Sequence, residues 1–349
     1  MAVTIKDVAE YANVSVSTVS MALNGKDYRI SEATREKVRA AVEHLNYRPN
    51  RTAVSLVTKE SRAIGLIVPD IKNTFFSELV AAVEEKCSDE GYSVIICTTN
   101  DEPKQDIKYV NFLLDRDIDG LLFVMSVSEK NNYAEECINL LQEARAPTVL
   151  IDREWQSDYA VNVSSDNEHG GYLACKHLLD LGHEKIGTIT GPLGTQSAKK
   201  RLDGYIRALK ERGIAFDPKL VTEGNYSIAS GYRHCDALLD QGVSAIFVGN
   251  DMMALGVYKR LRECGVKIPE DISIVGYDNL NFAEFLDVPL TTVSQPIIKM
   301  GTVAVIKLLN MLKNVDEQDE IFTPELICRD SAVSIQPKVE TCLCEVNTV

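Results

Sequence analysis

The sequence predicts a small all-α helix-turn-helix head with a hinge helix, joined to an α/β core of two lobes with parallel sheets. Two observations predict this fold. Three short helical patterns follow one another within residues 1–48. From Ala63 onward, continuous apolar strands alternate with helical stripes, which is the pattern of buried parallel sheets with crossover helices. This alternation runs twice, so we expect two similar lobes after the head.

The expected domains are a head at residues 1–48, a hinge and linker at 49–62, a two-lobed body at 63–335 and a tail at 336–349. With 349 residues, 45% of them hydrophobic, the chain can build several cores. No apolar run approaches the roughly 18 to 20 residues that span a membrane. The first residues lack the basic and apolar regions of a secretory signal, so we expect a cytoplasmic protein.

The nine cysteines, an odd number, fit a reducing compartment. Six of them stand singly in apolar or helical patterns and are expected to be reduced core residues: Cys87, Cys97, Cys137, Cys175, Cys235 and Cys264. Cys342 and Cys344 in the tail are closer together than most metal ligands and have no nearby histidine. We therefore predict neither a metal site nor a cofactor.

The net charge of −14 is unevenly distributed. Residues 1–60 hold nine Lys and Arg against seven Asp and Glu, a charge of +2, which leaves −16 for the rest. An acidic body is repelled by phosphates, so only the basic head is expected to dock on nucleic acid, with an affinity that falls as salt rises.

The first and third helices of the head have recognisable starts. Thr4 and Asp7 have the spacing of a capping box, and apolar residues then recur at helical spacing through Ala12. Ser31 is placed to cap the third helix, whose apolar stripe ends at Leu45. Together with the helix between them, these segments are expected to close one small core.

The stretch Val14–Gly25 is predicted to be the second helix of a helix-turn-helix. Ser15 can cap its first turn, and Gly25 suits the left-handed residue that ends helices. Its apolar side consists of Val19, Ala22 and Leu23, and its uncharged outer face of Val16, Ser17, Ser20, Met21 and Asn24. Such a face suits base edges and thymine methyls in a major groove. The alternative is a short amphipathic helix in another kind of small domain.

The segment Arg51–Val57 follows Pro49, which disfavours a helix at Arg48. It can be capped by Asn50 and is apolar, but it is too short to be helical alone. We expect it to order only against a second copy of itself or against DNA.

The body is predicted from alternating strands and helices. In the first lobe, strands are expected at 64–68, 92–98, 120–125 and 148–152, with helices at 76–87, 107–114 and 133–145. In the second lobe, strands are expected at 185–190, 220–223, 245–249 and 272–277. The chain is expected to cross between the lobes near 161–164, 291–295 and 321–328, with a helix at 300–312.

Polar residues follow the carboxyl ends of several strands, where open α/β sheets bind ligands. They comprise Asp152 and Arg153, Asn250 and Asp251, Asp278, and Arg201 at the start of a helix after the GPLG loop. Carboxylates and guanidinium groups bind paired hydroxyls, and the rings of Phe75 and Phe76 suit the C–H face of a sugar. One of these two rings must be core by helical spacing, and we expect Asp251 to cap the helix at Met252.

An enzyme is disfavoured by what the sequence lacks. The five histidines lie in or beside predicted helices and have no matching nucleophile motif: His44, His169, His177, His183 and His234. No glycine-rich phosphate loop or metal-ligand spacing occurs. A sugar-binding transport protein would have the same two lobes, but it would need an export signal and no head.

The chain resembles the LacI/GalR family of bacterial transcriptional regulators over residues 3–335. The head motifs are IKDVAEYANVSVSTVSMALNG, NYRPNRTAVSL and IGLIVPD, and the body motifs are IDGLLF, VLIDR, LGHEKIGTITGP, RLDGY, NDMMALG and VGYDN. The resemblance implies a repressor with a periplasmic-binding-protein-like core, which grips a two-fold symmetric double-stranded operator as a homodimer. It implies paired hinge helices in the minor groove, where Leu56 would be an intercalating wedge that bends the duplex.

The resemblance and the outer face of the second helix together give the expected DNA-binding residues: Thr4, Ser15, Val16, Ser17, Thr18, Ser20, Met21, Asn24, Arg29, Tyr47, Asn50, Ala53 and Leu56. Three positions depart from the family pattern. Met21 stands where many members have a polar base-reading residue, and Val54 where many have a hinge arginine. Thr74 replaces the proline common after the first strand, which changes the entrance to the ligand cleft.

For the effector, the resemblance points to Arg201, Asn250 and Asp278, supported by Phe75, Phe76, Arg153 and Tyr226. A buried ion pair across the cleft is the alternative for Arg201 and Asp278. A small sugar or sugar derivative is the expected effector. Some members bind purines through an arginine in the loop after GPL, where this chain has Gly194–Ser197. Others answer to a phosphorylated carrier protein, which stays open as a partner.

Overall fold

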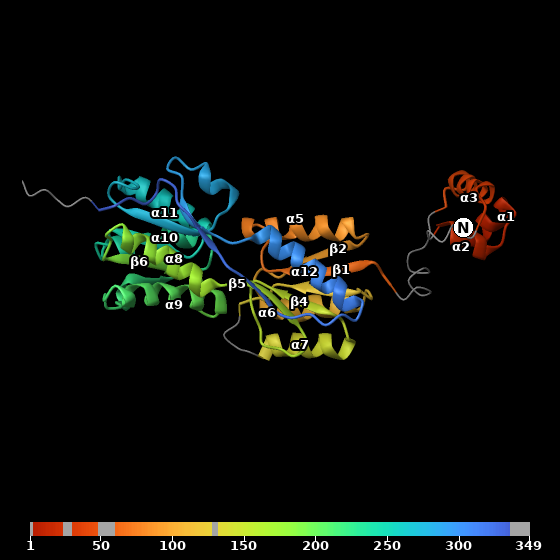
Figure 1. Cartoon of the computed structure of the whole chain (residues 1–349), viewed down its shortest axis with the longest axis horizontal. Coiled ribbons are helices and arrows are strands. Elements are labelled where there is room, and N and C mark those ends of the chain that lie inside the picture. Colours follow the sequence, from red (N-terminus) through yellow and green to blue (C-terminus); the bar gives the residue numbers. More distant parts are fainter. Residues whose placement is uncertain (1–2, 24–29, 48–59, 128–131, 336–349) are drawn as a thin grey trace, which may run out of the picture. The chain divides into compact units, whose positions relative to one another are not determined.

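The computed structural model describes residues 3–23, 30–47, 60–127 and 132–335 (Figure 1). The chain divides into two compact units, Met1–Ser61 and Arg62–Val349. The first unit holds the helices of the head, and the second holds both lobes of the body. In the parts of the chain that the structure describes, no helix is long and apolar enough to cross a membrane.

The head consists of α1 (Ile5–Ala12), α2 (Val16–Leu23) and α3 (Glu32–His44) around one core. The core contains Val8, Val19 and Val38, one from each helix, all fully buried.

The three predicted helix starts of the head are confirmed. The backbone N–H of Thr4 donates to Asp7 over 2.6 Å, that of Thr18 to the Ser15 hydroxyl over 3.1 Å, and that of Thr34 to the Ser31 hydroxyl over 3.3 Å. The predicted end of α2 at Gly25 and the hinge segment Arg51–Val57 lie outside the described residues.

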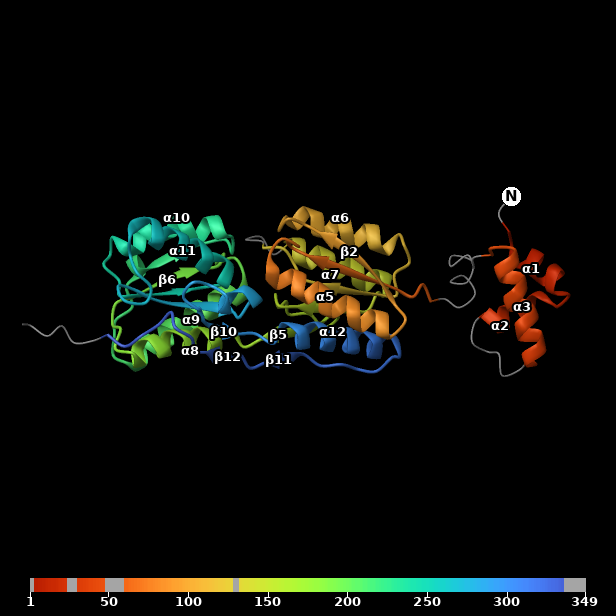
Figure 2. The same cartoon turned by 90° about the horizontal axis from the view of Figure 1, so that it is seen from above.

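Lobe 1 is built on a parallel sheet in the order β11-β5-β4-β3-β1-β2. Its strands are β1 (Ala63–Val68), β2 (Ser93–Thr98), β3 (Gly120–Phe123), β4 (Thr148–Ile151), β5 (Val161–Ser165) and β11 (Glu320–Phe322). Its helices are α5 (Thr74–Asp89), α6 (Pro103–Leu114), α7 (Asn132–Ala144) and α12 (Ile297–Leu312). Residues of α5 and α12 share one core with the sheet and those of α6 and α7 another, so the helices cover both faces (Figure 2).

Lobe 2 repeats this plan with the strand order β12-β10-β9-β8-β6-β7, in which only the pair β10–β12 is antiparallel within the described residues. Its strands are β6 (Ile186–Thr190), β7 (Val221–Glu223), β8 (Ala245–Val248), β9 (Ser273–Asp278), β10 (Thr291–Ser294) and β12 (Glu325–Ile327). Its helices are α8 (Asn167–Asp180), α9 (Gln196–Glu211), α10 (Ile228–Leu239) and α11 (Asp251–Cys264), with 3-10 turns η2 (Pro218–Leu220) and η3 (Asn281–Glu284).

The chain passes between the lobes three times within the described body. It leaves lobe 1 after β5, returns after β10 to form α12 and β11, and leaves again for β12. The segments in which we expected crossings therefore consist mostly of sheet strands, and 321–328 contains the end of β11 and all of β12, which belong to different sheets. Each crossing starts from a strand that is paired in a sheet, so backbone hydrogen bonds hold the chain near it.

Helices α8 and α9 pack backbone to backbone because glycines face the contact. A Cβ on Gly171 would lie 2.0 Å from the carbonyl oxygen of Arg201, and one on Gly204 would lie 2.0 Å from that of Glu168. No other residue fits at these positions without separating the helices. This contact fixes the position of Arg201 relative to α8.

The cysteine prediction is right for five residues and wrong for one. Cys87, Cys97, Cys137, Cys175 and Cys235 are free and buried, as expected. Cys264 is exposed, because it is the last residue of α11. The helix ends there, and the next residue, Gly265, has a left-handed backbone conformation (φ 72°). The tail pair Cys342 and Cys344 lies outside the described residues.

Candidate functional site

A cleft of about 600 Å³ lies between the lobes at the carboxyl ends of their strands. Side chains of both lobes line it. Lobe 1 contributes residues that follow β1, β2 and β4, and lobe 2 contributes residues that follow β7 and β8: Phe76, Asp101, Arg153, Tyr226 and Met252. The location agrees with the rule that open α/β sheets bind ligands beyond their carboxyl strand ends.

Arg153 forms the charged part of the lobe 1 wall. It is only 7% exposed, and its Nη1 and Nη2 donate to the two carboxylate oxygens of Asp101 over 2.5 and 3.2 Å. Nη1 also donates to the Met125 carbonyl over 2.7 Å. The guanidinium carbon lies 5.8 Å from the centre of the Phe76 ring. Its charge is thus balanced within lobe 1 before any ligand arrives.

Phe75 and Phe76 are both buried and meet edge to face, with ring centres 5.2 Å apart. Both belong to the core of lobe 1, and Phe76 also lines the cleft. We expected at least one of the two rings to be a core residue, and both are. Phe76 is the one that a ligand in the cleft can touch.

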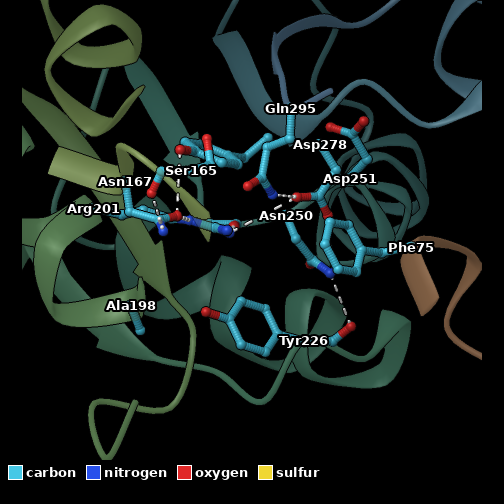
Figure 3. A network of polar contacts seen from close by, with 12 residues as sticks. Phe75, Ser165, Asn167, Ala198, Arg201, Tyr226, Asn250, Asp251, Asp278 and Gln295 are labelled. Atoms are coloured by element: carbon cyan, nitrogen blue, oxygen red, sulfur yellow. Dashed lines mark hydrogen bonds and ion pairs between the residues drawn. The ribbon is translucent and has the colours of Figure 1, made fainter. Parts of the chain in front are cut away.

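Behind the lobe 2 wall lies a buried group that we call the inner network: Arg201, Tyr226, Asn250, Asp278 and Gln295 (Figure 3). Tyr226 belongs both to the cleft wall and to the inner network. It lines the cleft, and its backbone carbonyl accepts a hydrogen bond from the Asn250 side-chain amide over 3.2 Å. The other four members are at most 6% exposed and do not line the cleft as it stands.

Arg201 is held by lobe 2 alone. Its Nε donates to Asn167 over 2.8 Å and its Nη1 to the Gly249 carbonyl over 2.7 Å. The guanidinium carbon stacks 3.8 Å from the centre of the Tyr277 ring. The prediction that Arg201 begins its helix is wrong, because α9 begins at Gln196 with Thr195 as its cap.

Asp278 ends β9 and lies 3.9 Å from Nη1 of Arg201. The ion pair considered for these residues therefore exists, but it does not span the cleft, because both belong to lobe 2. Gln295 donates to Oδ1 of Asp278 over 2.8 Å. Burial raises the pKa of Asp278 well above its usual range, and Arg201 opposes this shift.

The expected cap of α11 is corrected by one residue. Asn250, not Asp251, caps the helix, and its side-chain oxygen accepts from the backbone N–H of Met253 over 2.9 Å. Asp251 is fully buried in the first turn, where it accepts from the Thr292 hydroxyl over 2.7 Å and the Leu280 N–H over 2.9 Å. Burial raises the pKa of Asp251 to about 7.

Two polar atoms of the inner network are buried and have no hydrogen-bond partner among the described residues. They are the hydroxyl of Tyr226 and the side-chain oxygen of Gln295. Buried polar groups are nearly always paired in native proteins, so an unpaired one needs an explanation. Two such atoms in one network indicate a place where a ligand completes the hydrogen bonds.

The backbone is strained at the same place. Asp152, Tyr226 and Asp278 have φ values of 66°, 63° and 109°, a region that residues other than glycine rarely adopt. The ring of Tyr226 lies on Gly191, where a Cβ would come within 2.0 Å of its Cζ. Strained backbone of this kind concentrates at ligand sites, where the surrounding fold holds it in place.

Three contributors to the site were absent from the residues expected from the sequence. Asp101 follows β2, Asn167 begins α8 after β5, and Gln295 follows β10. Each lies close to the carboxyl end of a strand, so the rule used for Asp152 and Asp278 could also have found them. The part of the chain that the structure describes contains no group of three His, Cys, Asp or Glu side chains that could hold a metal ion.

In the head, α2 presents the expected uncharged face. Val16 is 41% exposed, Ser17 is exposed, and Thr18, Ser20 and Met21 are half-buried. The Ser15 hydroxyl is within 2.7 Å of that of Ser17 and 2.8 Å of that of Thr18.

The other residues predicted to contact DNA differ in their placement. Thr4 is exposed at the start of α1, and Tyr47 is half-buried against the head core. The remaining ones lie outside the described residues: Asn24, Arg29, Asn50, Ala53 and Leu56.

Comparison with protein families gives two matches. Residues 4–50 match the bacterial regulatory proteins of the lacI family, and residues 175–332 match a periplasmic binding protein-like domain. A transcriptional repressor named PurR from Vibrio atlanticus is 38% identical over 337 residues, which cover 95% of this chain and 99% of that protein. The PurR repressor of Haemophilus influenzae is 37% identical over 341 residues, with the same coverage.

Solved structures agree with these matches. The lac repressor dimer bound to operator and the anti-inducer ONPF has a TM-score of 0.84 and 31% identity, covering 96% of this chain and 100% of that one. The regulator CelR in complex with cellobiose has a TM-score of 0.71 and 29% identity, covering 94% and 99%. A LacI family regulator from Enterococcus faecium with bound ribose has a TM-score of 0.72 and 30% identity, covering 78% and 100%.

Proposed function

Because the chain belongs to the lacI family of bacterial regulatory proteins, we propose that it binds a two-fold symmetric operator as a homodimer and that a small sugar in the interlobe cleft modulates its affinity for DNA. The family and the fold predicted from the sequence are confirmed. The chain is a DNA-binding transcriptional repressor with a small-molecule effector, and it is not an enzyme. The sugar, the dimer and the symmetry of the operator are our proposals.

The observation that carries the sugar proposal is the combination of rings and polar groups around one cleft. Phe76 and Tyr226 offer ring faces from opposite lobes, and Asp278, Gln295 and Arg201 offer hydrogen-bonding groups behind them. This combination suits a molecule with C–H faces and several hydroxyls. Three solved relatives support it, since they hold cellobiose, ribose and ONPF as bound molecules.

We assign direct ligand contact to Phe76, Arg153 and Tyr226, which line the cleft. Arg201, Asn250 and Asp278 would meet the ligand where it reaches the inner network, and Phe75 would support Phe76 from the core of lobe 1. Since each lobe supplies part of the wall, a bound ligand favours one relative position of the lobes over others. Through that preference, a ligand bound in the cleft would change the affinity of the head for DNA.

We assign DNA contact to the head, residues 1–48, and to the hinge at 49–62, with the body at 63–335 carrying the dimer contact and the effector. The uncharged outer face of α2 would read bases in the major groove, with Val16, Ser17 and Met21 setting the sequence preference. Leu56 of the hinge would be the minor-groove wedge. A protein with this function would act on the nucleoid, in the cytoplasm.

Selection of binding sites from random duplexes tests the DNA part of the proposal. The wild-type protein should select a two-fold symmetric sequence, and sedimentation should give two chains per duplex. Met21→Arg should change the preferred base at symmetric positions of both half-sites, because arginine pairs with guanine in the major groove. The exposed Arg39→Ala on α3 serves as control and should keep the wild-type sequence. An asymmetric site bound by one chain would contradict the proposal.

A further inference from the structure

We propose that the cleft takes an uncharged ligand that donates hydrogen bonds, such as a free sugar, and rejects the phosphate ester of that ligand. The inference depends on the proposed function in one respect, since it takes this cleft as the effector site. It goes further because it states that the ligand is uncharged and donates hydrogen bonds, on the evidence of buried atoms in the inner network that have no partner.

The unmade hydrogen bonds are on acceptor atoms. Within the described chain, the side-chain oxygen of Gln295 and the hydroxyl of Tyr226 are buried without a partner. Oδ1 of Asp278 accepts a hydrogen bond from the same Gln295 side chain, through its amide nitrogen. A carboxylate and an amide oxygen can only accept, and a hydroxyl can do either. A ligand that donates to these atoms would complete the network.

Several donors of the same region already have partners. The Arg153 guanidinium binds both oxygens of Asp101 and the Met125 carbonyl. Arg201 donates to Asn167 and to the Gly249 carbonyl, and the Asn250 amide donates to the Tyr226 carbonyl. A phosphate oxygen can only accept, so to use one of these N–H groups it would have to displace a bond that is already made. That exchange gains little, because a made bond is lost for each bond formed.

The charged side chains that line the cleft also offer no excess of positive charge to an anion. On the lobe 1 wall, Arg153 is matched by Asp101. At the rim, Asp70 and Lys72 have opposite charges. Among the described residues that line the cleft, the positive and negative charges therefore cancel, and no unmatched cation is left to bind a phosphate.

Helix starts, which often bind phosphate, are occupied by side chains here. At the start of α10, which lines the cleft, the Ser227 hydroxyl accepts from the Ser230 N–H over 3.2 Å. At the start of α5, Asn73 accepts from the Phe75 N–H over 3.1 Å. Asn250 does the same for α11. These caps take up N–H groups that a phosphate would use.

The test measures binding to the purified full-length protein by calorimetry. The probes are D-ribose and D-glucose, their 5- and 6-phosphates, and hypoxanthine as an uncharged donor that is not a sugar. We expect at least one free sugar to bind with a Kd at least about ten-fold below that of its phosphate ester. Tyr226→Phe removes only the unpartnered hydroxyl and should weaken binding of that sugar by roughly ten-fold, while the Tm of the unliganded protein is kept.

Tyr172→Phe is the matched control, because its hydroxyl binds Glu211 on the surface of lobe 2, and it should bind the sugar like wild type. A phosphate ester that binds as tightly as its free sugar would overturn the inference and leave the sugar proposal standing. Binding of hypoxanthine alone would overturn the sugar proposal and support the inference. Failure of every probe to bind would overturn both, and an unchanged Kd in Tyr226→Phe would overturn the use of that hydroxyl.

Discussion

Asp251 shows how the site is built at the scale of single residues. Its carboxyl group is fully buried beneath β9 and β10, where Thr292 and the backbone of Leu280 donate to it. Gly276 leaves room for it, since a Cβ there would lie 2.2 Å from its Oδ1. These contacts tie α11 to the end of β9, and so fix Asn250 next to Asp278. The desolvation of the carboxyl group opposes this arrangement and raises its pKa to about 7.

The raised pKa predicts a particular pH dependence of stability. A carboxyl group with a higher pKa in the folded state favours folding most below its unfolded pKa of roughly 4, and this contribution is lost as pH rises to about 7. Asp251→Asn cannot titrate, so its stability relative to wild type should rise between pH 4 and pH 8, by up to about 4 kcal/mol. Denaturant unfolding across this range measures the effect.

Loss of one hydrogen bond in Asp251→Asn lowers stability equally at every pH, so the change with pH is the informative quantity. Asp115→Asn at the exposed end of α6 serves as control and should leave the pH profile of wild type unchanged. Parallel pH profiles for Asp251→Asn and wild type would show that burial of Asp251 does not shift its titration.

At the scale of elements, one ion pair joins the two lobes beside the cleft. Glu154 follows β4 in lobe 1, and its carboxylate accepts from Lys200 of α9 in lobe 2 over 2.6 Å and from the Ser164 hydroxyl over 2.7 Å. Glu154 is next to Arg153 in the chain, and Lys200 is next to Arg201, so both members of the ion pair adjoin a proposed ligand residue. The ion pair therefore bridges the lobes beside the two walls of the ligand site.

Lys200→Met should weaken sugar binding, because it removes this bridge and keeps the length of the side chain. The pair is partly exposed, so the loss should be below about 1 kcal/mol, or up to roughly five-fold in Kd. Lys176→Met is the control, since Lys176 pairs with Asp180 within α8 and does not bridge the lobes. Sugar affinity is measured by calorimetry. Equal losses of affinity in the two variants would show that the loss comes from removing a positive charge and not from removing the bridge between the lobes.

The elements also show what the sequence could and could not predict. The starts of α1, α2 and α3 could be read because a capping side chain and its N–H partner lie three residues apart. The cap of α11 was misplaced by one residue because Asn250 and Asp251 are both good caps, and only the contact of Asp251 with β10 separates them.

Other parts of the site depend on contacts between distant segments. The pairing of Arg153 with Asp101 and of Gln295 with Asp278 joins side chains from different strands. Periodicity predicts that each residue follows a strand, but not which neighbour its side chain finds. Likewise, the sequence offered an ion pair of Arg201 and Asp278 across the cleft as the alternative to ligand contact, whereas both residues come from lobe 2.

At the scale of the whole molecule, the proposal joins two ligands on one chain. The family match makes the protein a repressor with a small-molecule effector, and the cleft between its lobes is the site that we assign to that effector. If both ligands bias the same conformational change, each must alter the affinity for the other by the same factor. Couplings of this kind amount to roughly 1 to 3 kcal/mol, or about 5- to 150-fold.

The most direct test measures both affinities on one preparation: the Kd for the selected operator with and without saturating sugar, and the Kd for the sugar with and without saturating operator. The account predicts a change of at least about five-fold in the first, in either direction, and the same factor in the second. A sugar that fills the cleft and leaves the operator Kd unchanged would contradict it.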